Sequence, residues 1–316
     1  GRTHAEAYAA ISNAELVAIC DSRVDAAQEL ADELCVAAVT DAGKLLKEYE
    51  IDAVSICTPT PTHLEMIKAA AAAGKHIACE KPLARTISQA MEADRICEEA
   101  GVTLFVAHVV RWFPEYSRLK ALVDSGAIGE TVEVRASRQS RTPFRPDNWL
   151  TNVQNSGGAV LDLMIHEFDW LRSVYGDVRK VYARGLYNAG IPETDYALVT
   201  LRFDSGVIAH VEGSWQRPNG FAMCMEIAGT EGLLEYRSDL SSALVIETKG
   251  KDGQPGHTTR ENCEFVNPYQ LELQHFVDCL ENGTSPLVTG KDGVEAVRIA
   301  EAALRSITTG DPVTLA

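Results

Sequence analysis

The chain has 316 residues, of which 46% are hydrophobic and 23% charged, and a formal net charge of -16 at pH 7. This length predicts two domains, which we place at residues 1–110 and 111–316. The negative charge argues against a nucleic-acid backbone and against an anionic membrane surface as partners.

The first hundred residues alternate short apolar strands with helical stretches. Helix caps are predicted at Ser22, Asp41 and Thr86. Strands separated by helices at this cadence imply right-handed βαβ units and a parallel sheet. We predict strands at residues 16–20, 36–39, 51–57, 76–79 and 102–107, and helices at 1–12, 22–34, 41–49, 61–73 and 86–100.

The pattern changes after residue 114. A helix at 114–123 is followed by longer alternating segments, and short turn signals at 204–206 and 229–232 favour hairpins. The glycine-rich stretch 249–259 predicts a hairpin tip or a mobile loop. The fold class is therefore α/β for the first domain and α+β for the second, with a large, mostly antiparallel sheet. Its strands are expected at 131–140, 180–188, 196–203, 207–216, 224–228 and 233–238, before two amphipathic helices.

The usual glycine motif of a dinucleotide fold is incomplete. Gly1 opens a helix, and twenty residues later Asp21 closes the next strand, which is the normal interval from the glycine turn to the acid that binds the adenosine ribose. We infer that Gly1 is the last glycine of the motif and that the first, central strand is missing from this sequence. The alternative is that Gly1 is a flexible start and that Asp21 belongs to a cap region.

The eight cysteines contain no Cys-x-x-Cys pair, and several lie in apolar runs. This pattern predicts that the cysteines are reduced core residues of a cytoplasmic protein and form neither a disulfide framework nor a zinc site. No run approaches the roughly 20 apolar residues of a membrane span, and no signal-peptide pattern is present.

The stretch from Gly74 to Ala84 ends a buried strand in a charged pair, Glu80 and Lys81, followed by Pro82. Ligands of open α/β sheets bind beyond the carboxyl ends of the strands, and proline would hold Lys81 in one direction. Taken alone, Lys81 could equally be a surface lysine at a strand end.

Five motifs occur in order along the chain: Gly-Arg-Thr-His at 1–4, Ala-Ile-Cys-Asp at 18–21, Ile-Cys-Thr-Pro at 56–59 with Thr62 and His63, Cys-Glu-Lys-Pro-Leu-Ala at 79–84, and Gly-Gly-Ala-Val-Leu-Asp at 157–162 with His166. Together these motifs resemble the glucose–fructose oxidoreductase / inositol dehydrogenase / MocA family. The resemblance implies a Rossmann domain, a second domain with an open antiparallel sheet whose outer face makes a subunit interface, and a nicotinamide cofactor. Thr60 stands where many relatives have asparagine.

The resemblance implies that Lys81, Asp162 and His166 are catalytic. Residues 158–174 fit one helix, which places Asp162 and His166 at i and i+4 on one face. We assign His166 as general base, Asp162 as its orienter or a hydroxyl ligand, and Lys81 as the donor that stabilises a developing alkoxide. Without the family pattern, the Asp162/His166 pair could be a surface hydrogen bond or half of a metal site.

The cofactor is expected to be NAD, because Asp21 would repel the 2′-phosphate of NADP. Arg23 could instead pair with that phosphate, so NADP stays possible. His63 could also be a helix residue with no ligand. The full set of expected cofactor-binding residues is Gly1, Asp21, Ser22, Arg23, Thr58, Pro59, Thr60, His63, Glu80, Lys81 and Arg111.

Weaker expectations concern the substrate. His108 follows the last parallel strand and is expected near the nicotinamide or the substrate, while Arg141 and Trp149 could contact a sugar or pack in a loop. Asp169 is expected to be structural, paired with Arg172 on the same helix.

The leading hypothesis is an NAD(P)-dependent oxidoreductase acting on a secondary alcohol of a sugar or cyclitol, assembled as a homodimer or homotetramer through the C-terminal sheet. One alternative is a dinucleotide-binding regulator without turnover. Another is a relative that uses NAD transiently to cleave glycosides.

Overall fold

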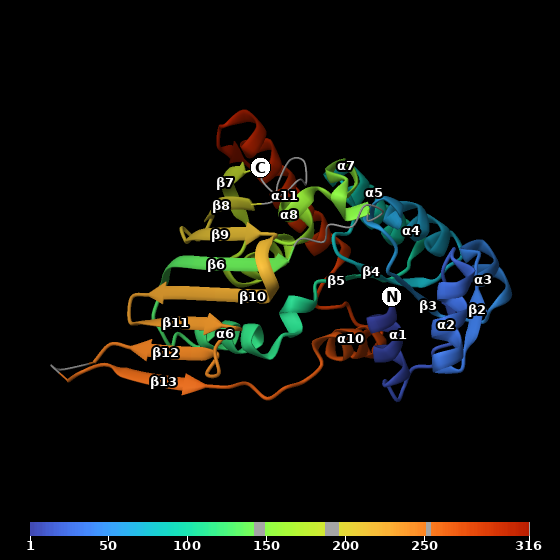
Figure 1. Cartoon of the computed structure of the whole chain (residues 1–316), viewed down its shortest axis with the longest axis horizontal. Helices are drawn as coiled ribbons and strands as arrows, with labels where there is room; N and C mark the ends of the chain where they lie inside the picture. Colours follow the sequence, from blue (N-terminus) through green and yellow to red (C-terminus); the bar gives the residue numbers. More distant parts are fainter. Residues whose placement is uncertain (142–148, 187–195, 251–253, 316) are drawn as a thin grey trace. The chain divides into compact units, whose positions relative to one another are not determined.

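The computed structural model describes residues 1–141, 149–186, 196–250 and 254–315. Its contacts divide the chain into two compact units (Figure 1). Unit 1 contains Gly1–Val109 and Asn267–Glu295, and unit 2 contains Val110–Val266 and Ala296–Ala316. The sequence predicts a boundary after residue 110, and the change from unit 1 to unit 2 falls after Val109. The later return of 267–295 to unit 1 has no counterpart in the sequence pattern.

Unit 1 has the alternating architecture expected of a Rossmann domain. Within the described residues its parallel strands form two separate sheets, β1-β2 and β3-β4-β5, with no strand joining β1 to β3. The elements are α1 (Arg2–Ala9), β1 (Ala18–Cys20), α2 (Val24–Leu34), β2 (Ala37–Val39), α3 (Ala42–Glu48), β3 (Ala53–Ile56), the 3-10 helix η1 (Thr60–Thr62), α4 (His63–Ala72), β4 (His76–Glu80), α5 (Ile87–Ala100), β5 (Leu104–Ala107), α10 (Pro268–Asn282) and the start of α11 (Gly290–Thr309).

Two of the three predicted helix caps are confirmed. The side chains of Asp41 and Thr86 accept backbone N–H groups three residues further on, at 3.0 and 3.3 Å. The cap predicted at Ser22 is wrong, because α2 begins one residue later, with Arg23 as N-cap and no side-chain cap. The reason is that the Asp21 carboxylate already accepts the backbone N–H of Arg23 at 2.9 Å.

The core of unit 1 explains why 267–295 belongs to it. Phe105 of β5 stacks on Phe276 of α10 with 5.5 Å between ring centroids, and α10 packs against α1. Ile77 of β4 and Ile67 of α4 are fully buried in the same unit. Burial of such aromatic and aliphatic side chains is the main stabilising contribution of a small domain.

Unit 2 is built on one large sheet. Within the described residues its strands follow the order β13-β12-β11-β10-β6-β9-β8-β7-β14, which Figure 1 shows from β7 to β13. Only β6 and β9 pair in parallel, so the sheet is mostly antiparallel, as expected. The strands are β6 (Thr131–Arg141), β7 (Val178–Leu186), β8 (Tyr196–Phe203), β9 (Ile208–Ser214), β10 (Gln216–Gly229), β11 (Gly232–Arg237), β12 (Leu244–Thr248), β13 (His257–Glu261) and β14 (Val313–Thr314).

The predicted hairpin near 249–259 is confirmed by the antiparallel pairing of β12 with β13, and residues 251–253 lie outside the described part of the chain.

Helices cover the sheet of unit 2. They are η2 (Val109–Trp112), α6 (Pro114–Asp124), η3 (Trp149–Thr151), α7 (Val153–Ser156), α8 (Gly158–Asp162), α9 (Ile165–Tyr175) and the end of α11.

The single helix predicted at 158–174 is wrong. The structure has two helices, α8 and α9, separated at Leu163 and Met164. The backbone N–H of Met164 bonds to the carbonyl of Ala159, five residues back, at 2.9 Å, which widens the turn. The Met164 side chain packs on Gly213 of β9, where a Cβ would lie 2.2 Å from the Met164 Cγ. The break therefore depends on a distant strand.

The cysteines are free thiols in the described structure, which contains all eight of them. Cys79, Cys97 and Cys279 are buried, as expected. The expectation of a core position is wrong for Cys20 and Cys35, which are exposed at the end of β1 and at the C-cap of α2. Within the described residues, no helix combines the length and the apolar character needed to cross a membrane.

We predict that Gly157→Ala destabilises the protein more than Gly126→Ala. Both glycines have left-handed backbones, with φ of 73° and 71°. A Cβ at Gly157 would lie 2.5 Å from the Cβ of Leu161, whereas a Cβ at Gly126 meets nothing within 4 Å. Urea unfolding should show a loss of about 1 kcal/mol for Gly126→Ala and about 2–4 kcal/mol for Gly157→Ala. Equal losses would contradict the close approach of Leu161.

Candidate functional site

The end of β4 exposes only its charged pair. From Ile77 to Ala84, every residue is buried except Glu80 and Lys81. The Lys81–Pro82 peptide bond is cis. Lys81 therefore leaves an apolar strand at the carboxyl edge of the sheet, where the sequence places a ligand.

The carboxylate of Glu80 is held inside unit 1. One oxygen accepts the backbone N–H of Lys81 at 3.0 Å, and the other lies 3.0 Å from Nε2 of His4. Burial alone would lower the pKa of His4, but the hydrogen bonds and charges of Cys57 and Glu80 outweigh it and raise this pKa to about 10. Burial would likewise raise the pKa of Glu80, and His4 lowers it. Both directions correspond to an imidazolium–carboxylate pair.

His63 ties two loops together. Its Nδ1 lies 2.9 Å from the carbonyl oxygen of Pro82, and its Nε2 lies 2.8 Å from that of Thr58. Burial lowers the pKa of His63, against the hydrogen bonds to the backbone. Thr58 and Pro59 are exposed beside it, whereas Thr60 is buried. His63 thus joins the loop after β3 to the turn after β4. Of the residues expected at the cofactor in the loop after β3, Thr58 and Pro59 are exposed.

The predicted ribose-binding acid lies at the carboxyl end of β1. The Asp21 side chain is 37% exposed, and Nε of Arg23 lies 3.4 Å from its Oδ1. Ser22 is exposed beside them, and Gly1 is the N-cap of α1. An accessible carboxylate at this strand end fits the ribose hydroxyls of a dinucleotide.

In unit 2, Asp162 and His166 stand out from buried surroundings. From Ser156 to Leu171, every residue is buried except these two. Asp162 ends α8, and His166 lies in the first turn of α9. The broken helix thus leaves both polar side chains half-buried in an otherwise buried stretch, although they do not share one continuous helix.

Two buried ion pairs fix α9 beside His166. Glu167 is 0% exposed, and Nε of Arg138 on β6 donates to its carboxylate at 2.8 Å. The Tyr116 hydroxyl donates to the same carboxylate at 3.3 Å. Burial would lower the pKa of Arg138, but the carboxylate of Glu167 outweighs burial and raises it. Asp169 forms the second pair, in which Arg111 donates from two nitrogens at 2.7 and 2.6 Å.

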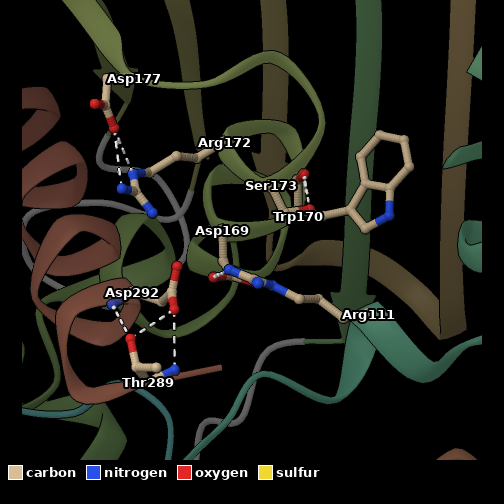
Figure 2. Close-up of polar contacts among 8 residues, drawn as sticks. All are labelled: Arg111, Asp169, Trp170, Arg172, Ser173, Asp177, Thr289 and Asp292. Carbon is tan, nitrogen blue, oxygen red and sulfur yellow. Dashed lines mark hydrogen bonds and ion pairs between the residues drawn. The ribbon is translucent and has the colours of Figure 1, made fainter. Parts of the chain in front are cut away.

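Figure 2 shows the second pair and its surroundings. Arg111 points toward Asp169, and Arg172 turns instead to Asp177, with 3.0 Å from its Nε to the carboxylate. Asp169 therefore forms a structural ion pair, as expected, but its partner is Arg111 and not the expected Arg172. Arg111, expected at the cofactor, has its guanidinium engaged by this carboxylate.

The comparisons with known proteins decide the family. Residues 1–108 match the model described as oxidoreductase family, NAD-binding Rossmann fold, and residues 116–235 match the GFO/IDH/MocA C-terminal domain. The chain belongs to the GFO/IDH/MocA family of oxidoreductases.

Its relatives include inositol dehydrogenases. The chain is 33% identical to the myo-inositol 2-dehydrogenase of Thermotoga maritima, over 97% of this chain and 93% of that protein. It is also 33% identical to the scyllo-inositol 2-dehydrogenase (NAD(+)) of Bacillus subtilis, over 96% of this chain and 90% of that protein. An oxidoreductase from Agrobacterium radiobacter, solved in complex with NAD+, L-tartaric acid and magnesium, has a TM-score of 0.87 and 26% identity, covering 99% of this chain and 94% of that chain.

Family membership confirms three expectations from the sequence. The fold is a Rossmann domain followed by a GFO/IDH/MocA C-terminal domain, the protein is an oxidoreductase, and its nucleotide-binding half is of the NAD-binding type. The roles of individual residues stay predictions.

The three residues expected at the substrate differ in burial. His108 is fully buried after β5, Arg141 is exposed at the end of β6, and Trp149 is half-buried in η3. Residues 142–148, between Arg141 and Trp149, lie outside the described residues.

Sequence reasoning missed three supporting residues, and two of them left a signal. Arg138 alternates with Val134 and Ala136 on the inward-facing positions of β6. This alternation alone predicts a buried arginine, which needs an acidic partner. His4 precedes Ile11 by seven residues on the buried side of the first helix, a spacing that predicts burial. Glu167 had no such signal, because a lone glutamate next to His166 looks like a solvated residue.

We predict that Asp169→Asn destabilises the protein by about 3–5 kcal/mol, because it leaves a buried guanidinium without its charge partner. The matched control is Asp177→Asn, which breaks the pair with Arg172. The Asp177 side chain is 70% exposed, so its loss should cost less than about 1 kcal/mol. Chemical denaturation of the three proteins measures both values. Similar losses for the two variants would show that the Arg111 pair is not buried in solution.

Proposed function

We propose that the protein is an NAD-dependent dehydrogenase that oxidises a secondary alcohol of a cyclitol or sugar. The observation that carries this proposal is the exposure pattern of two otherwise buried stretches. Each is interrupted only by half-buried residues that can handle protons or hydrogen bonds: Glu80 and Lys81 in one, Asp162 and His166 in the other. The names of the inositol dehydrogenases that it resembles support a cyclitol or sugar as substrate.

The roles follow from the chemistry of the side chains. An imidazole titrates near neutral pH, so His166 is suited to take the hydroxyl proton as general base. Asp162 would orient that imidazole or accept a hydrogen bond from a substrate hydroxyl. The Lys81 ammonium would donate a hydrogen bond to the reacting oxygen and stabilise its developing negative charge. NAD, when bound, supplies the hydride acceptor.

The cofactor preference rests on Asp21. Its accessible carboxylate can accept hydrogen bonds from the ribose hydroxyls and would repel a 2′-phosphate, which favours NAD. Arg23, with a 78% exposed side chain next to it, could offset that repulsion and admit NADP. The other expected cofactor-binding residues keep that role as proposals, and the exposed ones among them are Gly1, Ser22, Thr58 and Pro59.

We predict that the protein forms NADH from polyols, and that Lys81→Met and His166→Ala each lower kcat/KM by about 10²–10⁴. A panel of inositols and sugars, run with NAD and with NADP, measures this by NADH or NADPH absorbance. Lys68→Met and His257→Ala are matched controls, since both side chains lie elsewhere on their units.

Three outcomes would contradict the proposal. Unchanged rates in both site variants would exclude the assigned residues. Cofactor binding with no turnover on any substrate would favour a dinucleotide-binding regulator. Release of a leaving group without net NADH would favour a glycoside-cleaving enzyme that uses NAD transiently.

We also propose a homodimer or homotetramer formed through the outer face of the unit 2 sheet. Alternation along β7, β8 and β9 places exposed apolar residues on that face: Tyr182, Leu186, Leu198 and Ile208. Apolar groups clustered on an exposed sheet are typical of a protein interface.

We predict that Leu198→Glu lowers the oligomeric mass, because it buries a charge in the proposed interface. Light scattering or sedimentation measures the mass. Val24→Glu is the control, since Val24 is an exposed apolar residue of α2 in unit 1. An unchanged mass for Leu198→Glu, or a wild-type monomer, would contradict the interface.

We place the protein in the cytoplasm, with small molecules as its partners. Exposed free thiols at Cys20 and Cys35 suit a reducing compartment. The net charge of -16 makes a nucleic acid or an anionic membrane an unsuitable partner.

A further inference from the structure

We infer that His4 is a positioning residue for Lys81 and acts through the carboxylate of Glu80. The inference deepens the proposed function and rests on it, since it assumes that Lys81 contacts the substrate. It assigns a role to a helix residue that lies outside the three proposed catalytic groups.

A continuous chain of contacts leads from His4 to the lysine. Nε2 of His4 lies 3.0 Å from Oε1 of Glu80, and Oε2 of Glu80 accepts the backbone N–H of Lys81 at 3.0 Å. Both oxygens of the carboxylate are therefore engaged, one on each side. The carboxylate links α1 to the peptide unit from which the Lys81 side chain leaves.

His4 is itself fixed in place. It is 2% exposed, and its Nδ1 lies 2.7 Å from the hydroxyl oxygen of Ser55 on β3. With both ring nitrogens occupied, the imidazole cannot rotate without losing a contact. Helix α1 and strands β3 and β4 are thereby connected at one point, directly before Lys81.

Charge strengthens this chain. The pKa values of His4 and Glu80 are shifted toward an ion pair, and hydrogen bonds between ionised groups are shorter and stronger than neutral ones. The Glu80 side chain is 26% exposed, so without His4 water could compete for the carboxylate and the turn would loosen. A displacement of about 1 Å in a reacting group can cost about 100-fold in rate.

The two nitrogens of His4 allow a test by two neutral variants. In His4→Gln the side-chain amide nitrogen can take the place of Nε2 and still donate to Glu80, whereas the shorter side chain of His4→Asn reaches only toward Ser55. We expect His4→Asn to lower kcat about 10- to 100-fold. KM and the NADH dissociation constant should change less than about twofold, and His4→Gln should restore most of kcat.

Hydrogen exchange of the unliganded protein gives a readout that needs no turnover. The Lys81 amide should exchange about tenfold or more faster in His4→Asn than in wild type, and its protection should return in His4→Gln. If His4→Asn does not fold, Glu80→Gln tests the same chain. An amide carries no charge and has an acceptor oxygen at only one of the two positions that the carboxylate oxygens occupy, so kcat and Lys81 protection should fall together.

The control is His76→Gln, at the opposite end of β4, where the ring accepts the backbone N–H of Thr103 at 3.0 Å. It should change the unfolding free energy and leave kcat unchanged. Equal kcat losses in His4→Asn and His4→Gln, or unchanged Lys81 exchange, would overturn the inference. If His4→Asn keeps full kcat while Lys81→Met is inactive, the inference about His4 is wrong and the proposed function stands. If Lys81→Met is active, the proposed function itself is wrong.

Discussion

Burial of a carboxylate costs free energy unless a positively charged or hydrogen-bonding group pairs with it, and three paired carboxylates fix the backbone around the proposed site. Glu80 is met by His4, Glu167 by Arg138 and Asp169 by Arg111. In each unit an engaged carboxylate immediately precedes or follows a proposed catalytic residue. The backbone next to the proposed catalytic residues is therefore held by charge pairs, while the side chains of Lys81 and His166 are only half-buried.

The strands and most helices could be predicted because their signals are local. Short apolar runs between helical stretches mark the parallel strands, and the side chains of Asp41 and Thr86 cap helices by accepting backbone N–H groups three residues further on. The break in the helix at 158–174 could not be predicted in this way. It depends on Met164 packing against Gly213, a residue of another strand far along the sequence.

In the candidate site, too, residues with a local signal could be predicted and residues with distant partners could not. Lys81 and His166 are visible in the sequence because they interrupt apolar runs and fall within family motifs. His4 and Arg138 act through partners distant in the sequence, and one sequence without an alignment cannot pair them. Sequence patterns thus locate groups that face a ligand more readily than groups that support them from inside.

The return of 267–295 to unit 1 affects how this protein must be made. On the ribosome, α1 and Phe105 emerge well before Phe276, so the apolar surface of the nucleotide-binding half waits uncovered while unit 2 is synthesised. A gene fragment ending at residue 109 would carry that uncovered surface permanently and favour aggregation. A version with α10 joined by a short linker would supply the missing cover in the same polypeptide.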